Sequence, residues 1–533
     1  MEKKNKLKPR QSPVGHPWSS QRSKGTSGSE LTVSLPLTSS KRQDASYDTK
    51  RLPKLTIDDL PDELLVEIFD LYRRANVGLS DYQLWSIKLE WFNLIHVCKR
   101  WRTVMFESSS RLDLYFLLKP RMRGNLNTIM SRHSPPLPID IDYEYSPVQV
   151  LKPKDMGRMV AALKRPDRIR RIALSGKDEH LAKLFKATKC PFPALESLEL
   201  ELRIGFMVIP ATFLKGSNLH LRTLKLHHIF LPSIERLLSS APALSSLSLE
   251  YYSNVGPEPA MTQLLSYLQV VPCLRHLGLE ISCSINPLPQ PTESQKSFAL
   301  PKLTSLRYRG RSAFLNTLMA GFEAPSLREV DISLYDLTLP PISHLTRLIE
   351  DVVWENYHAF KVILERDYFR FGLLSSSDDI NDHSPRFRLL LFRFPDFAES
   401  MMQLSSAFSA KFSTIQELIV ISRHTTDAWE DVIPWHRFLL PFSSVKSVMF
   451  DGTNYLRIAN TLLRDQGGSN LAFLPVLEKI GVCKYSSYSA RISETQQALE
   501  QAAFESFVSA REQAGLPIKV SWMWSFEFPG STL

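Results

Sequence analysis

Apolar residues recur along most of the chain in the pattern Pro-x-Leu-x-x-Leu-x-Leu. Clear copies carry the proline and weaker copies lack it; they begin at Pro193, Pro242, Pro272, Pro301, Pro325 and Pro475, and at Ile169, Leu221, Ile415 and Val445. From Ile169 to Leu327 the first apolar residues of successive copies lie 26, 26, 23, 30, 29 and 24 residues apart. This period is expected when a helix or an irregular return follows each strand. The pattern therefore predicts ten stacked strands in a parallel sheet.

The pattern lapses between Leu327 and Ile415. These 88 residues leave room for about three more units, but only an apolar strand near residues 387–394 and a polar loop at 375–385 can be placed. We therefore expect roughly ten to twelve parallel strands in all, each too small to be stable unless it stacks on its neighbours.

Residues that alternate with the buried leucines point to the opposite face of each strand. That row consists of Glu199, Glu201, Lys225, His227, Glu250, Glu280, Arg307, Arg309, Glu329 and Asp331. Acidic residues dominate it, with a basic island near Arg307. The row is interpreted either as a solvated polar face or as a surface that binds a target protein with a basic segment.

Two segments before the sheet show helical spacing instead. Pro61 suits the first position of a helix, because its missing N–H would be unpaired there anyway. The apolar positions that follow are Leu64, Leu65, Ile68, Phe69 and Tyr72, and in a second helical stretch Leu94, Cys98, Trp101 and Met105. So small a helical unit has more apolar surface than its own core can cover, which predicts an outside partner.

A further helix is predicted near the C-terminal end. Ser493 and Gln496 form a capping-box signature, and Gly515 and Pro517 end the segment. Its apolar face is predicted to comprise Leu499, Ala503, Phe507 and Ala510. We expect this helix to cap the array.

Composition and charge narrow the classes of protein. The 533 residues are 43% hydrophobic and carry a formal charge of +10, of which +7 lies in residues 1–51. The remainder is nearly neutral, which argues against a nucleic-acid binder. Residues 1–50 are rich in serine and lysine and are predicted to be disordered. No segment is apolar enough for a membrane span or a secretory signal, so we expect a cytoplasmic or nuclear protein.

Motifs for catalysis or cofactor binding do not occur in the sequence. It contains no Walker A, HExxH or GxSxG motif and no metal-spaced cysteine cluster, so we expect no enzyme activity, no cofactor and no metal. His227 and His228 are predicted to point to opposite faces of a strand and therefore not to share a ligand. Cysteines at positions 190, 273, 283 and 483 are interpreted as small core residues.

Two segments together carry a family resemblance. The run LPDELLVEIF from Leu60, followed by HVCKRW from His96, resembles the F-box, and SPPLPIDID at 134–142 resembles the variant found in mushroom-forming fungi. The intervening stretch, 71–91, is longer than in compact F-boxes. With the degenerate leucine-rich repeats that follow, residues 51–525 resemble fungal F-box/leucine-rich-repeat proteins.

The resemblance implies a fold, a role and a set of residues. The fold would be α plus α/β, with a disordered tail at 1–50, an all-helical F-box at 51–118, a proline-rich connector at 119–165 and a leucine-rich-repeat solenoid at 166–533. The role would be that of a substrate receptor in a Skp–cullin–F-box ubiquitin ligase; the alternative is a non-catalytic interaction scaffold outside any ligase. Contact with the Skp adaptor would fall on Leu60, Pro61, Leu64, Leu65, Ile68, Phe69, Val97, Cys98 and Trp101.

Overall fold

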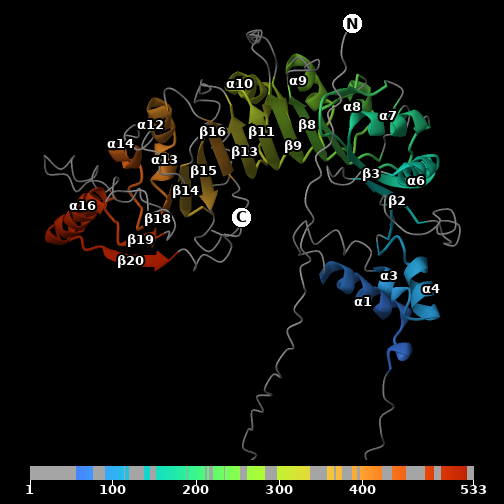
Figure 1. Cartoon of the computed structure of the whole chain (residues 1–533), viewed down its shortest axis with the longest axis horizontal. Helices are drawn as coiled ribbons and strands as arrows, with labels where there is room; N and C mark the ends of the chain where they lie inside the picture. Colours follow the sequence, from blue (N-terminus) through green and yellow to red (C-terminus); the bar gives the residue numbers. More distant parts are fainter. Residues whose placement is uncertain are drawn as a thin grey trace, which may run out of the picture. The chain divides into compact units, whose positions relative to one another are not determined.

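The structure is a computed structural model of the chain (Figure 1). It describes residues 56–75, 91–112, 114–118, 137–143, 152–188, 190–210, 213–214, 220–232, 234–252, 261–282, 297–335, 357–364, 368–374, 387–392, 397–422, 435–451, 474–484 and 494–524. Contacts divide the chain into two compact units, Met1–Leu60 and Pro61–Leu533. The first is described only at its end, where the 3-10 turn η1 (Ile57–Asp59) lies. The tail predicted at 1–50 falls outside the described residues.

Three helices form a small module near the start of the second unit: α1 (Asp62–Ala75), α3 (Trp91–Leu94) and α4 (Lys99–Glu107). The first begins at Asp62, and the carbonyl of Pro61 accepts from the N–H groups of Leu64 and Leu65. Side chains buried between these helices are Leu65, Val66, Phe69, Leu94, Val104 and Met105. The module thus has a core of its own.

The second predicted helical stretch is interrupted. Residues 95–97 form a turn, and Cys98 is extended, with φ −153° and ψ 173°. The N–H of Trp101 donates to the Cys98 sulfur at 3.4 Å, so the thiol caps α4. A continuous helix through Leu94 and Cys98 was therefore a wrong prediction, because helical spacing of apolar residues does not reveal a cap within the run.

Sixteen strands of the described chain form one sheet, and most neighbours are parallel. Their order is β1-β2-β3-β4-β6-β8-β9-β11-β13-β16-β15-β14-β17-β18-β19-β20. In chain order they are β1 (Phe116–Leu118), β2 (Ile139–Tyr143), β3 (Ile169–Gly176), β4 (Ser197–Leu202), β6 (Thr223–His227), β8 (Ser246–Tyr252), β9 (His276–Ser282), β11 (Ser305–Gly310), β13 (Glu329–Leu334), β14 (Ala359–Leu364), β15 (Tyr368–Leu374), β16 (Phe387–Phe392), β17 (Glu417–Ser422), β18 (Ser447–Asp451), β19 (Lys479–Lys484) and β20 (Lys519–Trp524).

The ten strands predicted from the apolar pattern are all present. The sheet is larger than the ten to twelve strands expected, because it also contains β1 within the predicted F-box, β2 within the predicted connector, β14 and β15 in the segment without recognisable repeats, and β20 after the predicted cap helix. Two short parallel pairs stand apart from the main sheet: β5 (Met207–Val208) with β7 (Ile229–Phe230), and β10 (Phe298–Ala299) with β12 (Phe322–Glu323). The arrangement is of the α/β class.

The leucines of successive strands lie at the same level of the sheet. Paired in register are Leu198, Leu224, Leu247, Leu277, Leu306 and Val330, each at most 1% exposed. Burial of one such side chain contributes roughly 1.5 to 3 kcal/mol, and each one needs the next strand to cover it. The repeat spacing in the sequence therefore arises because the equivalent apolar residue of each strand packs beside that of the next strand.

Helices pack on one face of this sheet, as the side view shows (Figure 1). They are α6 (Pro153–Leu163), α7 (Asp178–Ala187), α8 (Ile234–Ser239), α9 (Met261–Gln269), α10 (Ser312–Gly321), α12 (Phe397–Ala407), α13 (Ser409–Phe412) and α14 (Trp435–Leu439), with a 3-10 turn η2 (Pro166–Arg168) before β3. Apolar residues of these helices and of the strands form one continuous core. The opposite face of the strands carries the polar row.

The segment without recognisable repeats contains three strands, but they are not three repeats. β14, β15 and β16 form an antiparallel meander, and β15 and β14 lie between β16 and β17, in reverse of chain order. Both β14 and β15 carry apolar residues on the polar face as well as in the main core: Ile363 and Leu374 belong to a second small core there, together with Ile419 of β17. Because apolar and polar residues do not alternate regularly in these strands, the sequence pattern shows neither which face is buried nor which way the strand runs.

The C-terminal elements differ from the predicted cap. Helix α16 (Glu494–Gln513) is followed by β20, so a strand is the last described element of the sheet. Leu499 is 68% exposed, whereas Phe504, Phe507 and Arg511 are buried. The predicted apolar face was therefore wrong at Leu499. Gly515, predicted to end the helix, has φ +75°, the left-handed conformation that commonly follows a helix C-terminus.

Substitution of Gly310 by alanine is expected to destabilise the protein. A Cβ at this position would lie 2.6 Å from the carbonyl oxygen of Ile281 on the neighbouring strand, which cannot move independently. We expect a loss of about 1 to 3 kcal/mol in the free energy of unfolding, measured by urea denaturation. Gly157→Ala in α6 is the control, because nothing lies within 4 Å of its Cβ. A melting curve for Gly310→Ala equal to that of Gly157→Ala would contradict the prediction.

Candidate functional site

The helical module exposes a stripe of large apolar side chains on α1. Leu64 is 49% exposed, Ile68 41% and Leu71 64%, at positions i, i+4 and i+7, which lie on one side of a helix. Val97, in the turn before α4, is 59% exposed. We call these four residues the apolar stripe. Isolated exposed leucines are ordinary, but a helical row of them is typical of an interaction surface.

The nine residues expected to contact an adaptor have different positions. Pro61, Leu64, Ile68 and Val97 are exposed, and Leu60, Cys98 and Trp101 are partly buried. Leu65 and Phe69 are fully buried within the module, so we leave both out of the candidate surface. Leu71 was missed, although it continues the same helical spacing beyond the motif.

Contacts between the helices orient the stripe. The rings of Phe69 and Trp101 lie 5.0 Å apart, and Arg100 pairs with Asp62 at 2.6 Å. Arg111 pairs with Glu67. These contacts hold one side of α1 against α4, which leaves Leu64 and Ile68 on the other side.

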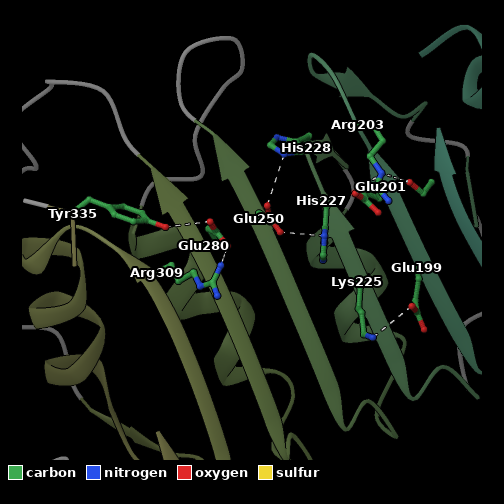
Figure 2. A network of polar contacts seen from close by, with 11 residues as sticks. Glu199, Glu201, Arg203, Lys225, His227, His228, Glu250, Glu280, Arg309 and Tyr335 are labelled. Carbon is green, nitrogen blue, oxygen red and sulfur yellow. Dashed lines mark hydrogen bonds and ion pairs between the residues drawn. The ribbon is translucent and has the colours of Figure 1, made fainter. Parts of the chain in front are cut away.

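The polar face of the strands forms a second candidate surface (Figure 2). Glu199 accepts from Arg171 at 2.8 Å and lies 3.5 Å from Lys225. Glu201 pairs with Arg203 at 3.0 Å. The acids at this end of the row are therefore neutralised by cations from the same or the adjacent strand.

Both histidines of the pair at 227 and 228 reach the same carboxylate (Figure 2). His227 Nδ1 lies 3.1 Å and His228 Nε2 3.8 Å from Glu250. The prediction that they point to opposite faces was wrong, because His228 has φ +58°, and this left-handed backbone ends the alternation of the strand. The two imidazoles and Glu250 form one polar cluster.

Glu280 is held from two sides in the next part of the row. Arg309 lies 3.4 Å from one of its oxygens, and the Tyr335 hydroxyl donates to the other at 3.3 Å. Burial and the Glu280 charge raise the pKa of Tyr335 to about 12, so its hydroxyl remains a donor at neutral pH. Beyond it, Asp331 lies between Arg307 at 3.7 Å and Arg388 at 3.5 Å.

Acidic residues do not dominate this face once neighbouring strands are included. Of the six acids in the predicted row, Glu329 is exposed, four pair with an arginine or lysine, and Glu250 lies beside His227 and His228. Sequence reasoning missed Arg171, Arg203 and Arg388, which come from β3, the end of β4 and the irregular meander. These arginines neutralise acids on the same or neighbouring strands, and the alternation of residues along one strand does not show which strands become neighbours.

Replacing Glu250 by glutamine is expected to change stability little. Glu250 is partly buried, and a hydrogen bond to a histidine contributes about 0.5 to 1.5 kcal/mol; glutamine keeps a side-chain oxygen as an acceptor for the histidines, so most of that contribution is retained. We expect a shift of less than about 1 kcal/mol in urea denaturation at neutral pH. A larger loss would show that this cluster is a structural centre of the sheet rather than a polar surface.

The described part of the chain contains no cluster of metal ligands and no membrane-spanning helix. No group of three or more His, Cys, Asp or Glu side chains there is placed to hold a metal ion. Cys190 is exposed and Cys273 partly buried, so the core interpretation was wrong for Cys190; positions 283 and 483 have no described side chain. Over the described ranges no helix has the length and apolarity to cross a membrane. No protein-family model and no curated protein matches the chain.

Proposed function

We propose that this protein is the substrate receptor of a Skp–cullin–F-box ubiquitin ligase. The observation that carries the proposal is the apolar stripe. Three of its residues lie on α1, which begins within LPDELLVEIF, and Val97 lies within HVCKRW, where α4 begins and packs against α1. These two segments resemble the F-box. A helix of this kind binds a partner by laying its exposed apolar face into a groove.

The strands would supply the target-binding part. Their leucine register and the return helices on one face support a leucine-rich-repeat solenoid, whose free face is polar and rich in paired charges. Solenoids commonly use such an extended face for protein recognition.

The mechanism would be proximity rather than chemistry by this chain. The adaptor would hold the helical module, and the strands would hold the target near the subunits that transfer ubiquitin. Raising the effective concentration of the target at those subunits is sufficient to accelerate transfer. The cytoplasm and the nucleus are the compartments in which we place this activity.

Co-purification tests the proposal. The full chain, expressed with a Skp adaptor and a cullin, is expected to elute with both on size exclusion. Recovery of stable partner complexes that contain neither subunit would instead favour the alternative, an interaction scaffold outside any ligase.

A further inference from the structure

Four arginines surround the point where the order of the strands reverses. Arg307 and Arg309 lie on β11, Arg388 on β16 and Arg370 on β15. All four side chains project from the polar face, and β13 lies between β11 and β16. We call these four residues the arginine cluster. The meander that brings Arg388 and Arg370 here interrupts the repeating sheet.

One level of the cluster already holds a carboxylate. Arg307, Asp331 and Arg388 are register partners on three adjacent strands. Since neighbouring strands lie about 4.8 Å apart, the two arginines are roughly 10 Å apart at Cα, with Asp331 between them. The Asp331 carboxylate lies 3.7 Å from Arg307 and 3.5 Å from Arg388. The spacing therefore suits an anionic oxygen group between two guanidinium groups.

The next level has the arginines but no acid between them. There the register runs from Arg309 through Ser333 and Leu390 to Arg370. Ser333 and Leu390 thus separate Arg309 from Arg370 by three strand spacings, roughly 14 Å at Cα, and neither residue brings a charge. Arg309 pairs with Glu280 of β9, which lies on the other side of β11 from β13 and also accepts from the Tyr335 hydroxyl. No carboxylate of the described residues pairs with Arg370, whose guanidinium lies 5.5 Å from the centroid of Tyr368.

Unused donors remain at this second level. The Nε atoms of Arg309 and Arg370 are buried and have no hydrogen-bond partner in the described structure. A buried donor without a partner is unfavourable, so a ligand that supplies an acceptor gains affinity from it. Arginine in addition presents two parallel donors, which match carboxylate and phosphate oxygens.

The charge balance of the cluster is positive. Among the described residues, four guanidinium groups face two carboxylates, Asp331 and Glu280. Burial lowers the pKa of Arg388, and the charges of Arg370, Arg307 and Arg309 lower it further, against the opposing effect of Asp331. The guanidinium groups thus repel one another across β13, and an added anion would relieve that repulsion.

Aromatic rings border the same level. The Tyr335 and Phe392 rings lie 4.9 Å apart, and those of Tyr368 and Phe392 6.0 Å apart. Rings beside arginine provide flat apolar contact for a peptide and hold the guanidinium groups in place.

We propose that the arginine cluster, centred on Arg309, Ser333 and Arg370, binds an anionic oxygen group, carboxylate or phosphate, on the target protein. This reverses the expectation of a basic target. It rests on the proposed function, because the target is the protein that the strand face would present to the ligase.

The test is fluorescence anisotropy with the purified full chain and no adaptor. The probes are a fluorescein-labelled peptide of alternating Asp and Gly, the same peptide with phosphoserine for Asp, and a neutral Asn-Gly peptide. We expect the full chain to bind at least one anionic probe and not the neutral one, with affinity falling as salt rises. The anionic probe that binds with the higher affinity shows whether the cluster prefers a carboxylate or a phosphate group.

Matched variants locate the binding. Arg309→Gln with Arg370→Gln is expected to weaken binding of the anionic probe about tenfold or more, since both charged hydrogen-bond donors to the anion are lost. Arg171→Gln with Arg203→Gln removes the same charge elsewhere on the face and is expected to change affinity less than about threefold. Asp331→Asn should strengthen binding, because it releases Arg307 and Arg388 from their internal carboxylate. Circular dichroism checks folding, and Arg370→Gln alone replaces the double variant if that unfolds.

Three results would overturn the inference: no binding of either anionic probe, equal binding of the neutral probe, or equal losses in both double variants. Adaptor capture is measured separately on the same samples. Capture without anion binding contradicts this inference alone, and anion binding without capture contradicts the proposed function alone.

Discussion

Replacement of Leu64 and Ile68 by aspartate is expected to abolish capture of the Skp adaptor. The two side chains are 49% and 41% exposed on one side of α1, so neither contributes much to the core of the module. Burial of each against a partner contributes roughly 1.5 to 3 kcal/mol, and a buried aspartate adds an unpaired charge. We therefore expect a loss of more than about a hundredfold in affinity, measured by pull-down and by surface plasmon resonance.

The control is a leucine exposed elsewhere. Leu499 on α16 is 68% exposed, and Leu499→Asp should leave adaptor capture unchanged. Trp101→Ala is a poor choice for the test, because Trp101 packs on Phe69 and its loss would loosen the module itself. Undiminished capture by the double aspartate variant, with unchanged circular dichroism, would refute the F-box assignment.

Truncation of Phe442 to alanine is expected to destabilise the second half of the sheet strongly. Phe442 is fully buried and lies 4.7 Å from Phe412, 5.5 Å from Phe360 and 5.6 Å from Phe438, ring centroid to ring centroid. Phe360 belongs to the meander strand β14, so this aromatic cluster ties the irregular strands to the return segments. Loss of a buried ring costs about 3 to 5 kcal/mol in the free energy of unfolding.

Chemical denaturation followed by circular dichroism measures this loss. Phe442→Leu keeps most of the volume and should cost less than half as much. The anionic peptide probes should also bind Phe442→Ala more weakly, because Arg370 lies on β15, which pairs with β14, and Arg388 lies on β16, which pairs with β15. A loss below about 1 kcal/mol would contradict the assignment of Phe442 to the packing that holds the meander.

Ten strands could be predicted from the sequence because their signal is local. Residues such as Leu198 and Leu200 alternate with polar neighbours, and the same alternation returns in each unit at the same core level. Helix α1 was recognisable for a similar reason, since its apolar positions and the acidic residues of its first turn lie within a few residues of one another. Where both faces are apolar, as in β14 and β15, this signal disappears, and the antiparallel meander could not be predicted.

The sequence by itself determined the ten repeated strands, helix α1 and which faces of these elements are apolar, because these features depend on periodicity within single elements. Only the tertiary structure decided how charges combine. Arg388 neutralises Asp331 from 57 residues along the chain, and Arg309 and Arg370 come to one level across β13 and β16. It also decided that Leu64 is exposed while Leu65 is buried, and that His227 and His228 share Glu250. The exposure of a side chain and its ion pairs depend on which helices and strands pack beside it. Local sequence patterns indicate which face of an element is apolar, but not which other elements pack against that face.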